Sequence, residues 1–364
     1  MGDQMNGLES TFTWVGGRIG NRQAATLWLL VLVLTVAACG DGGSPEEPAT
    51  SVAGEVTASS NPDTSSPPET TSTTAPLEDN GEATPLIPLP VGKLVFDSDR
   101  SGNLDLWLLE EGSTEPIQLT EDSGSDRVGT LTNDGEAVIF STDRAGGPDS
   151  PTGLRRFDLY QVDIATGEET HLLGSRTYNS GAVLSPDGST MAFSSDASGS
   201  THIYLAGPDA SSPEQITDEN ATNSGPEWSP DGTQIVYSSH SGDSWDIWIM
   251  NADGSDRRPL IEDEADSSSP AWSPDGTRIV FHSDQDGEAD NLYSYDLDTE
   301  EITQLTSGPA SDRYATWSPD GEWIAFDSDR DGDEPDIYIL SMTDGTVSRL
   351  TDDPARDAFP DWGE

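Results

Sequence analysis

A five-residue motif, Trp-Ser-Pro-Asp-Gly, recurs along the chain and constrains its fold more than any other feature. It begins at Trp228, Trp272 and Trp317, and weaker copies begin at Leu131 and Leu184. One series of aromatic residues and one of aliphatic residues repeat with the same spacing, which is 44 or 45 residues apart from one gap of 53. Three markers that share one period predict a repeat architecture, because periods of roughly 20–50 residues are typical of solenoids and propellers.

Each repeat predicts four short strands, which we call a, b, c and d. In the unit that contains Trp272, the four segments are residues 270–273, 278–281, 291–295 and 302–305. Pro274-Asp275-Gly276 predicts a tight turn between strands a and b, because Pro suits its first central position and Gly its last. Four strands in a unit of this length form the blade of a β-propeller.

The two ends of the repeat region predict how the ring closes. Markers of strands b, c and d occur six times, but the first unit, which starts at Gly92, has no strand a. The C-terminal segment 358–362 supplies one, with Trp362 placed one period after Trp317. We therefore predict that residues 91–364 form an all-β fold, a six-bladed β-propeller of four-stranded blades closed by the C-terminal strand. Such a closed ring leaves no unpaired edge at the junction.

The N-terminal quarter of the chain differs from the repeats. Residues 1–38 are predicted to be a secretory signal peptide, because Arg18 and Arg22 precede an apolar run that is short for a membrane span. The resemblance described next implies that residues 1–38 are a lipoprotein signal peptide. Residues 39–90 are rich in Pro, Ser and Thr, and residues 40–90 contain no Lys, Arg or aromatic residue. This composition predicts a disordered tether. For residues 1–38, the alternative is a plain signal peptide, or an uncleaved anchor with an incidental cysteine.

Val36-Ala37-Ala38-Cys39 resembles the lipobox of bacterial lipoproteins, in which the cysteine is lipidated. The resemblance implies that Cys39 is the lipid-attachment residue and that the lipid bilayer is a partner. It also implies that the protein is extracytoplasmic and anchored to the cell membrane.

The repeats resemble the PD-type WD-like repeats of TolB-family periplasmic propellers. The resemblance lies in Trp-Ser-Pro-Asp-Gly, Ser328-Asp329-Arg330-Asp331-Gly332 and Asp336-Ile337-Tyr338. It implies a propeller, but the globular N-terminal domain of TolB has no counterpart in the sequence, so the partners of TolB do not carry over. The repeats also resemble the propeller that precedes the hydrolase domain of prolyl-oligopeptidase-like enzymes, and no such domain is expected after Glu364.

Charge restricts the partners. The chain has 68 acidic and 16 basic residues, which gives a net charge of −52. A surface this acidic repels phosphate backbones, so we exclude nucleic acid as a partner. The b–c loops are predicted to gather carboxylates around one mouth of the channel, where a cation or a basic partner would bind; a general surface adaptation is the alternative. This candidate acidic face consists of Asp97, Asp99, Asp284, Asp286, Asp327, Asp329 and Asp331.

Motifs for metal binding and catalysis are weak. Asp327, Asp329 and Asp331 alternate as in an EF-hand calcium loop, but the twelfth position is Tyr338 rather than a bidentate Glu. They are a weak calcium candidate, and a solvated turn is the alternative. His240 and His282 are expected to be polar loop or edge residues. No Gly-x-Ser-x-Gly nucleophile motif occurs.

We therefore expect no enzymatic activity and no cofactor, with calcium as the one possible exception. The sequence favours a lipid-anchored propeller that acts as a binding or scaffold module for an envelope protein or ligand. The alternative is a calcium-dependent propeller hydrolase, or the propeller subunit of a peptidase-like assembly.

Overall fold

A computed structural model describes residues 84–144, 152–174, 176–218, 221–287 and 289–364. The predicted signal peptide, Cys39 and most of the predicted tether lie outside these ranges. In the described ranges, no helix is long and apolar enough to cross a membrane.

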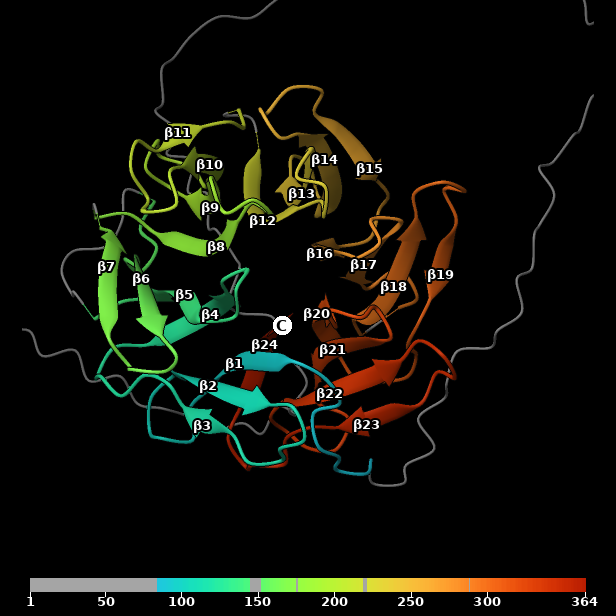
Figure 1. Cartoon of the computed structure of the whole chain (residues 1–364). Helices are drawn as coiled ribbons and strands as arrows, with labels where there is room; N and C mark the ends of the chain where they lie inside the picture. The colour runs from blue at the N-terminus through green and yellow to red at the C-terminus, as the bar shows by residue number, and fades with distance from the viewer. Residues whose placement is uncertain (1–83, 145–151, 175, 219–220, 288) are drawn as a thin grey trace, which may run out of the picture. The chain divides into compact units, whose positions relative to one another are not determined.

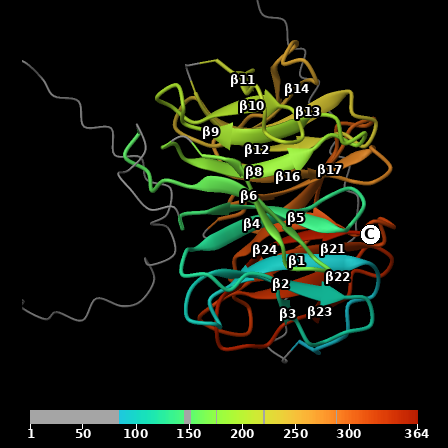
Figure 2. The same cartoon turned by 60° about the vertical axis from the view of Figure 1, so that its left-hand side comes forward.

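The described residues form 24 strands in six antiparallel sheets of four strands each, arranged as blades around one axis (Figure 1). Figure 2 shows the blades side by side from a second direction. Blade 1 contains β24 (Asp357–Gly363), β1 (Lys93–Ser98), β2 (Asp105–Glu110) and β3 (Ile117–Gln118). Blade 2 contains β4 (Asp126–Leu131), β5 (Ala137–Thr142), β6 (Asp158–Asp163) and β7 (Glu169–Leu173). Blade 3 contains β8 (Asn179–Leu184), β9 (Met191–Ser195), β10 (His202–Ala206) and β11 (Glu214–Gln215).

The other three blades repeat the same order from the axis outward. Blade 4 contains β12 (Thr222–Trp228), β13 (Gln234–His240), β14 (Asp246–Asn251) and β15 (Arg258–Ile261). Blade 5 contains β16 (Ser267–Trp272), β17 (Arg278–Ser283), β18 (Asn291–Asp296) and β19 (Ile302–Gln304). Blade 6 contains β20 (Asp312–Trp317), β21 (Trp323–Ser328), β22 (Asp336–Ser341) and β23 (Val347–Arg349). The predicted fold class is confirmed.

The C-terminal strand closes the ring as predicted. β24 is the innermost strand of blade 1 and pairs antiparallel with β1, with Trp362 opposite Leu94. The Trp362 indole donates a hydrogen bond to the backbone oxygen of Val91 at 2.7 Å. Two ion pairs join the same ends of the chain: Arg356 contacts Asp97 at 2.8 Å, and Arg100 contacts Asp357 at 2.5 Å.

The core lies between the blades. The second strand of each blade carries one large aromatic residue that is at most 2% exposed: Phe96, Phe140, Phe193, Tyr237, Phe281 and Phe326. In blade 5, the ring of Phe281 stacks on that of Tyr293 with centroids 5.7 Å apart. Complete burial of such a side chain contributes about 1.5–3 kcal/mol. The repeated aromatic residues are therefore packing residues of the core.

The Ser-Pro-Asp-Gly turn is held by its own side chains. In blade 5, the Asp275 carboxylate accepts hydrogen bonds from the Ser273 hydroxyl at 2.6 Å and from the Thr277 backbone N–H at 3.0 Å. Gly276 has a φ of +72°, which disfavours residues with a side chain. In the blade 3 copy, the hydrogen bond from Ser185 is the largest influence that lowers the pKa of Asp187 to about 2. The predicted turn is confirmed, and its Asp has a structural role.

The ordered domain begins before residue 91. Ile87 donates its backbone N–H to the Arg349 oxygen at 2.9 Å, and Leu89 donates to the Ser113 oxygen at 3.0 Å. Leu89 is 1% exposed and packs into the core cluster around Trp362. The last residues of the predicted tether therefore join blades 6 and 1. Their Pro-rich composition is like that of the preceding segment, so the sequence gives no indication that the propeller buries Leu89.

Candidate functional site

Each innermost strand contains one residue with a positive φ, where the strand bulges beside the axis. These residues are Val128, Gly181, Gly225, Ser269, Tyr314 and Phe359, with φ between 50° and 61°. All six line an axial cavity of about 150 Å³. Only blades 3 and 4 have glycine at this position. The other four blades place a side chain at the bulge, in a backbone conformation that costs about 1 kcal/mol or more for a residue other than glycine.

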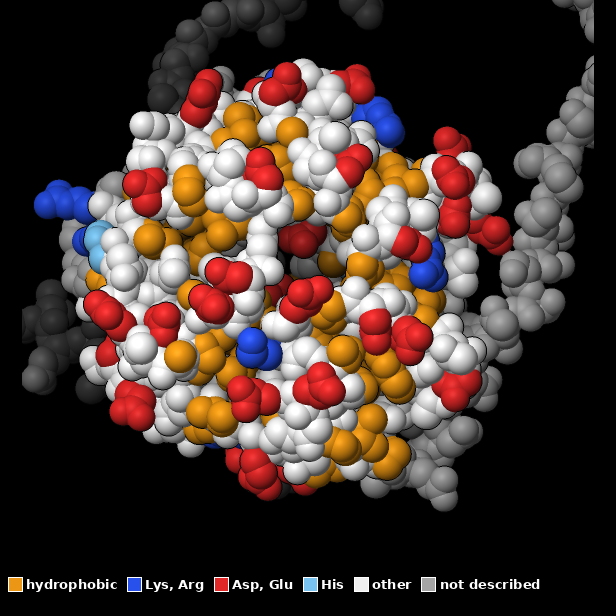
Figure 3. Space-filling model, viewed as in Figure 1, with side chains coloured by type: hydrophobic (Ala, Val, Ile, Leu, Met, Phe, Trp, Pro, Cys, Tyr) orange, Lys and Arg blue, Asp and Glu red, His pale blue; other side chains and the backbone are white. Residues whose placement is uncertain are grey.

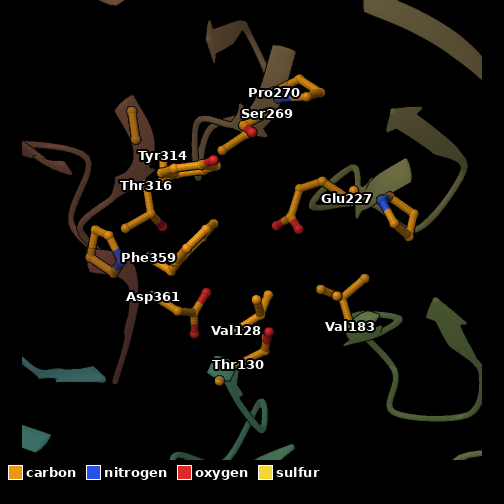
Figure 4. A pocket seen from close by; sticks show the side chains of 17 residues that line it. Val128, Thr130, Val183, Glu227, Ser269, Pro270, Tyr314, Thr316, Phe359 and Asp361 are labelled. Atoms are coloured by element: carbon orange, nitrogen blue, oxygen red, sulfur yellow. The ribbon is translucent and has the colours of Figure 1, made fainter. Parts of the chain in front are cut away.

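A ring of six half-buried side chains follows, one from each blade and each two residues after the bulge residue. The ring consists of Thr130, Val183, Glu227, Ala271, Thr316 and Asp361. Two of the six are acidic. Glu227 belongs to blade 4 and Asp361 to blade 1, so they lie on opposite sides of a six-bladed ring. Figure 4 shows both carboxylates pointing into the channel.

The ring also forms the floor of a wider funnel of about 430 Å³. The funnel opens on the face that carries the Pro-Asp-Gly turns, and its wall includes prolines of those turns and the motif tryptophans. These wall residues are Pro186, Pro230, Pro274, Pro319, Trp228, Trp272, Trp317 and Trp362. Figure 3 shows the hollow at the centre of the ring, with acidic side chains inside it. A funnel lined by both polar and apolar residues therefore leads to two opposed carboxylates.

The two carboxylates have different surroundings. The Asp361 carboxylate accepts a hydrogen bond from the Leu131 backbone N–H at 2.8 Å. Burial raises the pKa of Asp361 to about 6, and this hydrogen bond limits the rise. Among the described residues, no group donates a hydrogen bond to the Glu227 side chain. Burial, and then the charge of Asp361, raise the pKa of Glu227 to about 8. The pair can therefore accept a cation or exchange a proton near neutral pH.

A second group of polar residues lies behind the bulge residues, toward the b–c loops. The rings of Tyr314 and Phe359 are in contact, with centroids 3.9 Å apart. Beyond them, burial raises the pKa of Asp327 to about 7, and the charges of Arg356 and Arg313 oppose this rise. The carboxylate of Asp327 is thus enclosed by the protein and balanced by two guanidinium groups.

His282 differs from its prediction as a loop or edge residue. It lies in β17, is 6% exposed, and its Nε2 is 2.8 Å from the Ser268 hydroxyl. Burial lowers its pKa to about 4. The residue is buried because strand b continues further than its polar composition indicated. His240 ends β13, and its ring lies 5.2 Å from that of Trp245.

Three carboxylates of the candidate acidic face hold the inner strands in place. Asp99 accepts the backbone N–H of Arg356 at 3.1 Å. Asp284 and Asp329 accept the equivalent N–H groups of blades 5 and 6, at 2.9 and 2.8 Å. The same bond recurs in blades 2 and 3, where Ser125 donates to Asp143 and Tyr178 donates to Asp196. The repeated loop Asp therefore caps the start of the inner strand of its own blade.

The other four carboxylates of this face also have partners in the fold. Asp286 and Asp331 accept the hydroxyls of Tyr293 and Tyr338, at 2.8 and 3.0 Å. Asp97 and Asp327 are strand residues with 0% and 5% exposure, not loop residues. The described part of the chain contains no group of three or more His, Cys, Asp or Glu residues arranged to hold a metal. Calcium at Asp327, Asp329 and Asp331 gains no support from this arrangement.

Sequence reasoning overlooked the acidic pair in the channel. Glu227 and Asp361 each come directly before the tryptophan that marks strand a, Trp228 and Trp362. The tryptophan marks this position in the sequence, but the β-bulge of the inner strand decides that its side chain faces the axis. The features that all repeats share indicate packing, whereas the charge of the channel comes from a position that is acidic in two of the six copies.

The blades and the channel through their axis define a six-bladed β-propeller with an acidic axial cavity. The chain belongs to the TolB beta propeller domain family, PD40, whose model matches residues 150–268 and 226–363. This finding confirms the resemblance of the repeats.

Solved structures share the fold. TolB from Acinetobacter baumannii has a TM-score of 0.65 and 18% identity, over 76% of this chain and 68% of that one. The putative TolB from Agrobacterium tumefaciens has a TM-score of 0.56 and 19% identity, over 71% and 88%. An oligogalacturonate lyase solved with manganese has a TM-score of 0.50 and 23% identity, over 71% and 73%.

A curated sequence from Agrobacterium fabrum, an uncharacterized protein, is 42% identical over 62 residues. The match covers 17% of this chain and 21% of that relative. These similarities describe the fold and do not identify a ligand.

Proposed function

We propose that this protein is an extracytoplasmic, lipid-anchored binding module that takes its ligand in the axial channel. The observation that carries the proposal is the Glu227 carboxylate, which points into an open channel and receives no hydrogen bond from the described residues. A carboxylate that faces an open cavity and has no partner within the fold is available to a ligand, which would supply the missing partner.

The propeller suits this role because it is a rigid frame. Six inner strands each contribute one residue to the ring around the channel, so the positions of Glu227 and Asp361 are fixed by the backbone pairing of their blades. The wide funnel gives a ligand access from the face with the Pro-Asp-Gly turns. Rigid elements position binding groups more accurately than loops do.

The location and the anchor are proposed from the sequence together with the family. Cys39 ends a lipobox-like segment, and TolB-like propellers are the family to which the chain belongs. The Cys39→Ala variant tests the anchor: it moves from the membrane fraction to the soluble fraction if the cysteine carries a lipid. If the variant still pellets with membranes after carbonate washing, lipidation at Cys39 is wrong.

Capture of partners from solubilised envelope tests the binding role. The full-length protein serves as bait beside two tryptophan variants. Ala271→Trp places a large side chain in the ring at the channel floor, whereas Glu301→Trp places it at an exposed turn on the same face. We expect the native protein and the Glu301→Trp variant to capture a partner that the Ala271→Trp variant does not capture. A partner retained by all three proteins would show that the channel is not the site.

Catalysis is the second candidate function, and the carboxylate pair favours it. Two carboxyl groups with pKa values of about 8 and about 6 face one cavity, and acid–base pairs of enzymes are separated in pKa in the same way. Turnover of esters, glycosides or peptides, with and without calcium, tests this candidate. Activity that Glu227→Gln abolishes would establish an enzyme, and capture without turnover would favour the binding module.

A further inference from the structure

We propose that the axial cavity binds a primary ammonium group, presented by a lysine side chain or by a small aliphatic amine. This inference rests on the proposed function and specifies the chemistry of its ligand. It follows from three features of the cavity: where its acceptors lie, what its walls are made of, and what its net charge is.

The acceptors surround the axis. Glu227 and Asp361 approach from opposite blades, and Asp361 has a threonine on each side of it in the ring, Thr130 in blade 2 and Thr316 in blade 6. An ammonium group has three N–H donors and no acceptor. An ammonium group in the cavity would therefore face carboxylate or hydroxyl groups from several blades, whereas a neutral amide would bring an acceptor toward two carboxylates.

The walls between these acceptors are apolar or aromatic. Val183 and Ala271 flank Glu227 in the ring, and Val128 and Phe359 line the adjoining cavity. Figure 4 shows the Glu227 carboxylate across the channel from Tyr314 and Phe359. Methylene groups pack against such walls while a charged head reaches polar atoms, as lysine side chains do on protein surfaces. Aromatic rings add an attraction for cations.

The size of the cavity fits an alkyl ammonium group. A volume of about 150 Å³ is on the order of that which holds benzene in an engineered protein cavity. The funnel above it is wider, at about 430 Å³, and has room for the backbone from which a lysine projects. Both sources of the ammonium group are therefore sterically possible.

A hard metal ion fits the ring less well. Calcium takes six to eight oxygen ligands, usually from several carboxylates and carbonyl groups. Here two of the six ring positions, Val183 and Ala271, offer no side-chain oxygen, and the two carboxylates come from opposite blades. The arrangement favours a cation that brings its own apolar stem.

The charge balance explains why binding would be favourable. Above about pH 8, where both carboxylates are ionised, the cavity holds two negative charges inside a protein of net charge −52. One ammonium group reduces their repulsion, and the field of the whole protein raises the local concentration of cations. A ligand that binds only the folded state then stabilises it by mass action.

Thermal unfolding of the full-length protein tests the proposal with defined probes. n-Butylammonium is compared with sodium and calcium at equal ionic strength. A peptide with one lysine, acetyl-Gly-Lys-Gly-amide, is compared with its norleucine counterpart. We expect n-butylammonium and the lysine peptide to raise the melting temperature above the sodium control. Glu227→Gln should weaken both effects about tenfold in ligand concentration, whereas Glu322→Gln, at an exposed position on the same face, should leave them unchanged.

The sources are distinguished by the two probes. A lysine peptide that binds at lower concentration than n-butylammonium points to a protein partner, and the reverse order points to a free amine. Equal stabilisation by sodium and n-butylammonium, or stabilisation by calcium alone, would overturn the proposal. If the probes fail while Ala271→Trp still abolishes capture of a partner, the ammonium inference is wrong and the proposed function stands.

Discussion

Glu227 and Asp361 occupy the same position of β12 and β24, in blades that lie opposite each other across the channel. The other four blades have Thr, Val, Ala and Thr at this position. The six blades share one backbone plan, so the charged character of the channel depends on two substitutions in a repeated frame. Because only two blades have an acidic residue here, the channel has two carboxylates on opposite sides, and no single repeat predicts this arrangement.

The acidic pair should make stability depend on pH. The folded-state pKa values of about 8 for Glu227 and about 6 for Asp361 exceed their ordinary values of 4.5 and 3.8. The folded protein therefore binds more protons than the unfolded chain between these values. The resulting stabilisation is complete below about pH 4 and is lost as the pH rises through about 8. We expect Glu227→Gln to remove part of this dependence.

Urea unfolding of the native protein and of Glu227→Gln, at about pH 5, 7 and 9, measures the effect. The variant should gain stability relative to the native protein as the pH rises. The change should be smaller than the ~1.4 kcal/mol per pH unit of one fully coupled proton, because water reaches the pair through the funnel. Parallel pH profiles for the two proteins would contradict the shifted pKa of Glu227.

The closing strand should be essential for stability. Trp362 is 7% exposed and joins the core cluster between blades 1 and 6. Trp362→Ala should lower the free energy of unfolding by about 3–5 kcal/mol. Trp323→Ala, at a half-buried position packed against the same cluster, should cost less. Equal losses, measured by chemical denaturation, would mean that Trp362 has no special role in closing the ring.

The fold could be predicted from the sequence because its signals are local and repeated. The turn Ser273-Pro274-Asp275-Gly276 is specified by side chains within five residues of one another. The buried aromatic of strand b, such as Phe281, recurs once per period. Ring closure could be predicted by counting strands. The first unit has no strand a, and the C-terminal segment with Trp362 is a strand a that no b, c or d strands follow.

The site was less predictable because it depends on which atoms face each other across the ring. The sequence predicts that the loop residue Asp329 is a binding group, but in the structure its carboxylate accepts the backbone N–H of Ser311. Composition alone cannot predict this hydrogen bond. To predict the pair in the channel, one must know which side chains of each inner strand face the axis. The β-bulge decides this. A bulge at Val128 or Phe359 leaves no clear mark in the sequence, because residues other than glycine occupy it.

Residues 85–89, which contact blades 6 and 1, should stabilise the closed ring in addition to the C-terminal strand. Leu89 is 1% exposed, whereas Leu86 in the same segment is 43% exposed. Leu89→Ala should cost about 2–5 kcal/mol, and Leu86→Ala should change stability by less than about 0.5 kcal/mol. Thermal and urea unfolding of the two variants provide the comparison. Two equal, small effects would mean that residues 85–89 do not contribute to the folded domain.

The loop carboxylates should act as strand caps, and Asp329 offers a clean test. Its carboxylate accepts the Ser311 backbone N–H at 2.8 Å, at the start of β20. Asp329→Ala removes the acceptor and should cost about 1–2 kcal/mol. Asp329→Asn keeps a side-chain oxygen and should cost less, and Asp333→Ala, at an exposed position of the same loop, should have little effect. Urea unfolding ranks the three variants, and amide hydrogen exchange at Ser311 should accelerate only in Asp329→Ala. If Asp329→Ala and Asp333→Ala are equally stable, the carboxylate of Asp329 is free to bind a cation, and the acidic face predicted from the sequence regains its support.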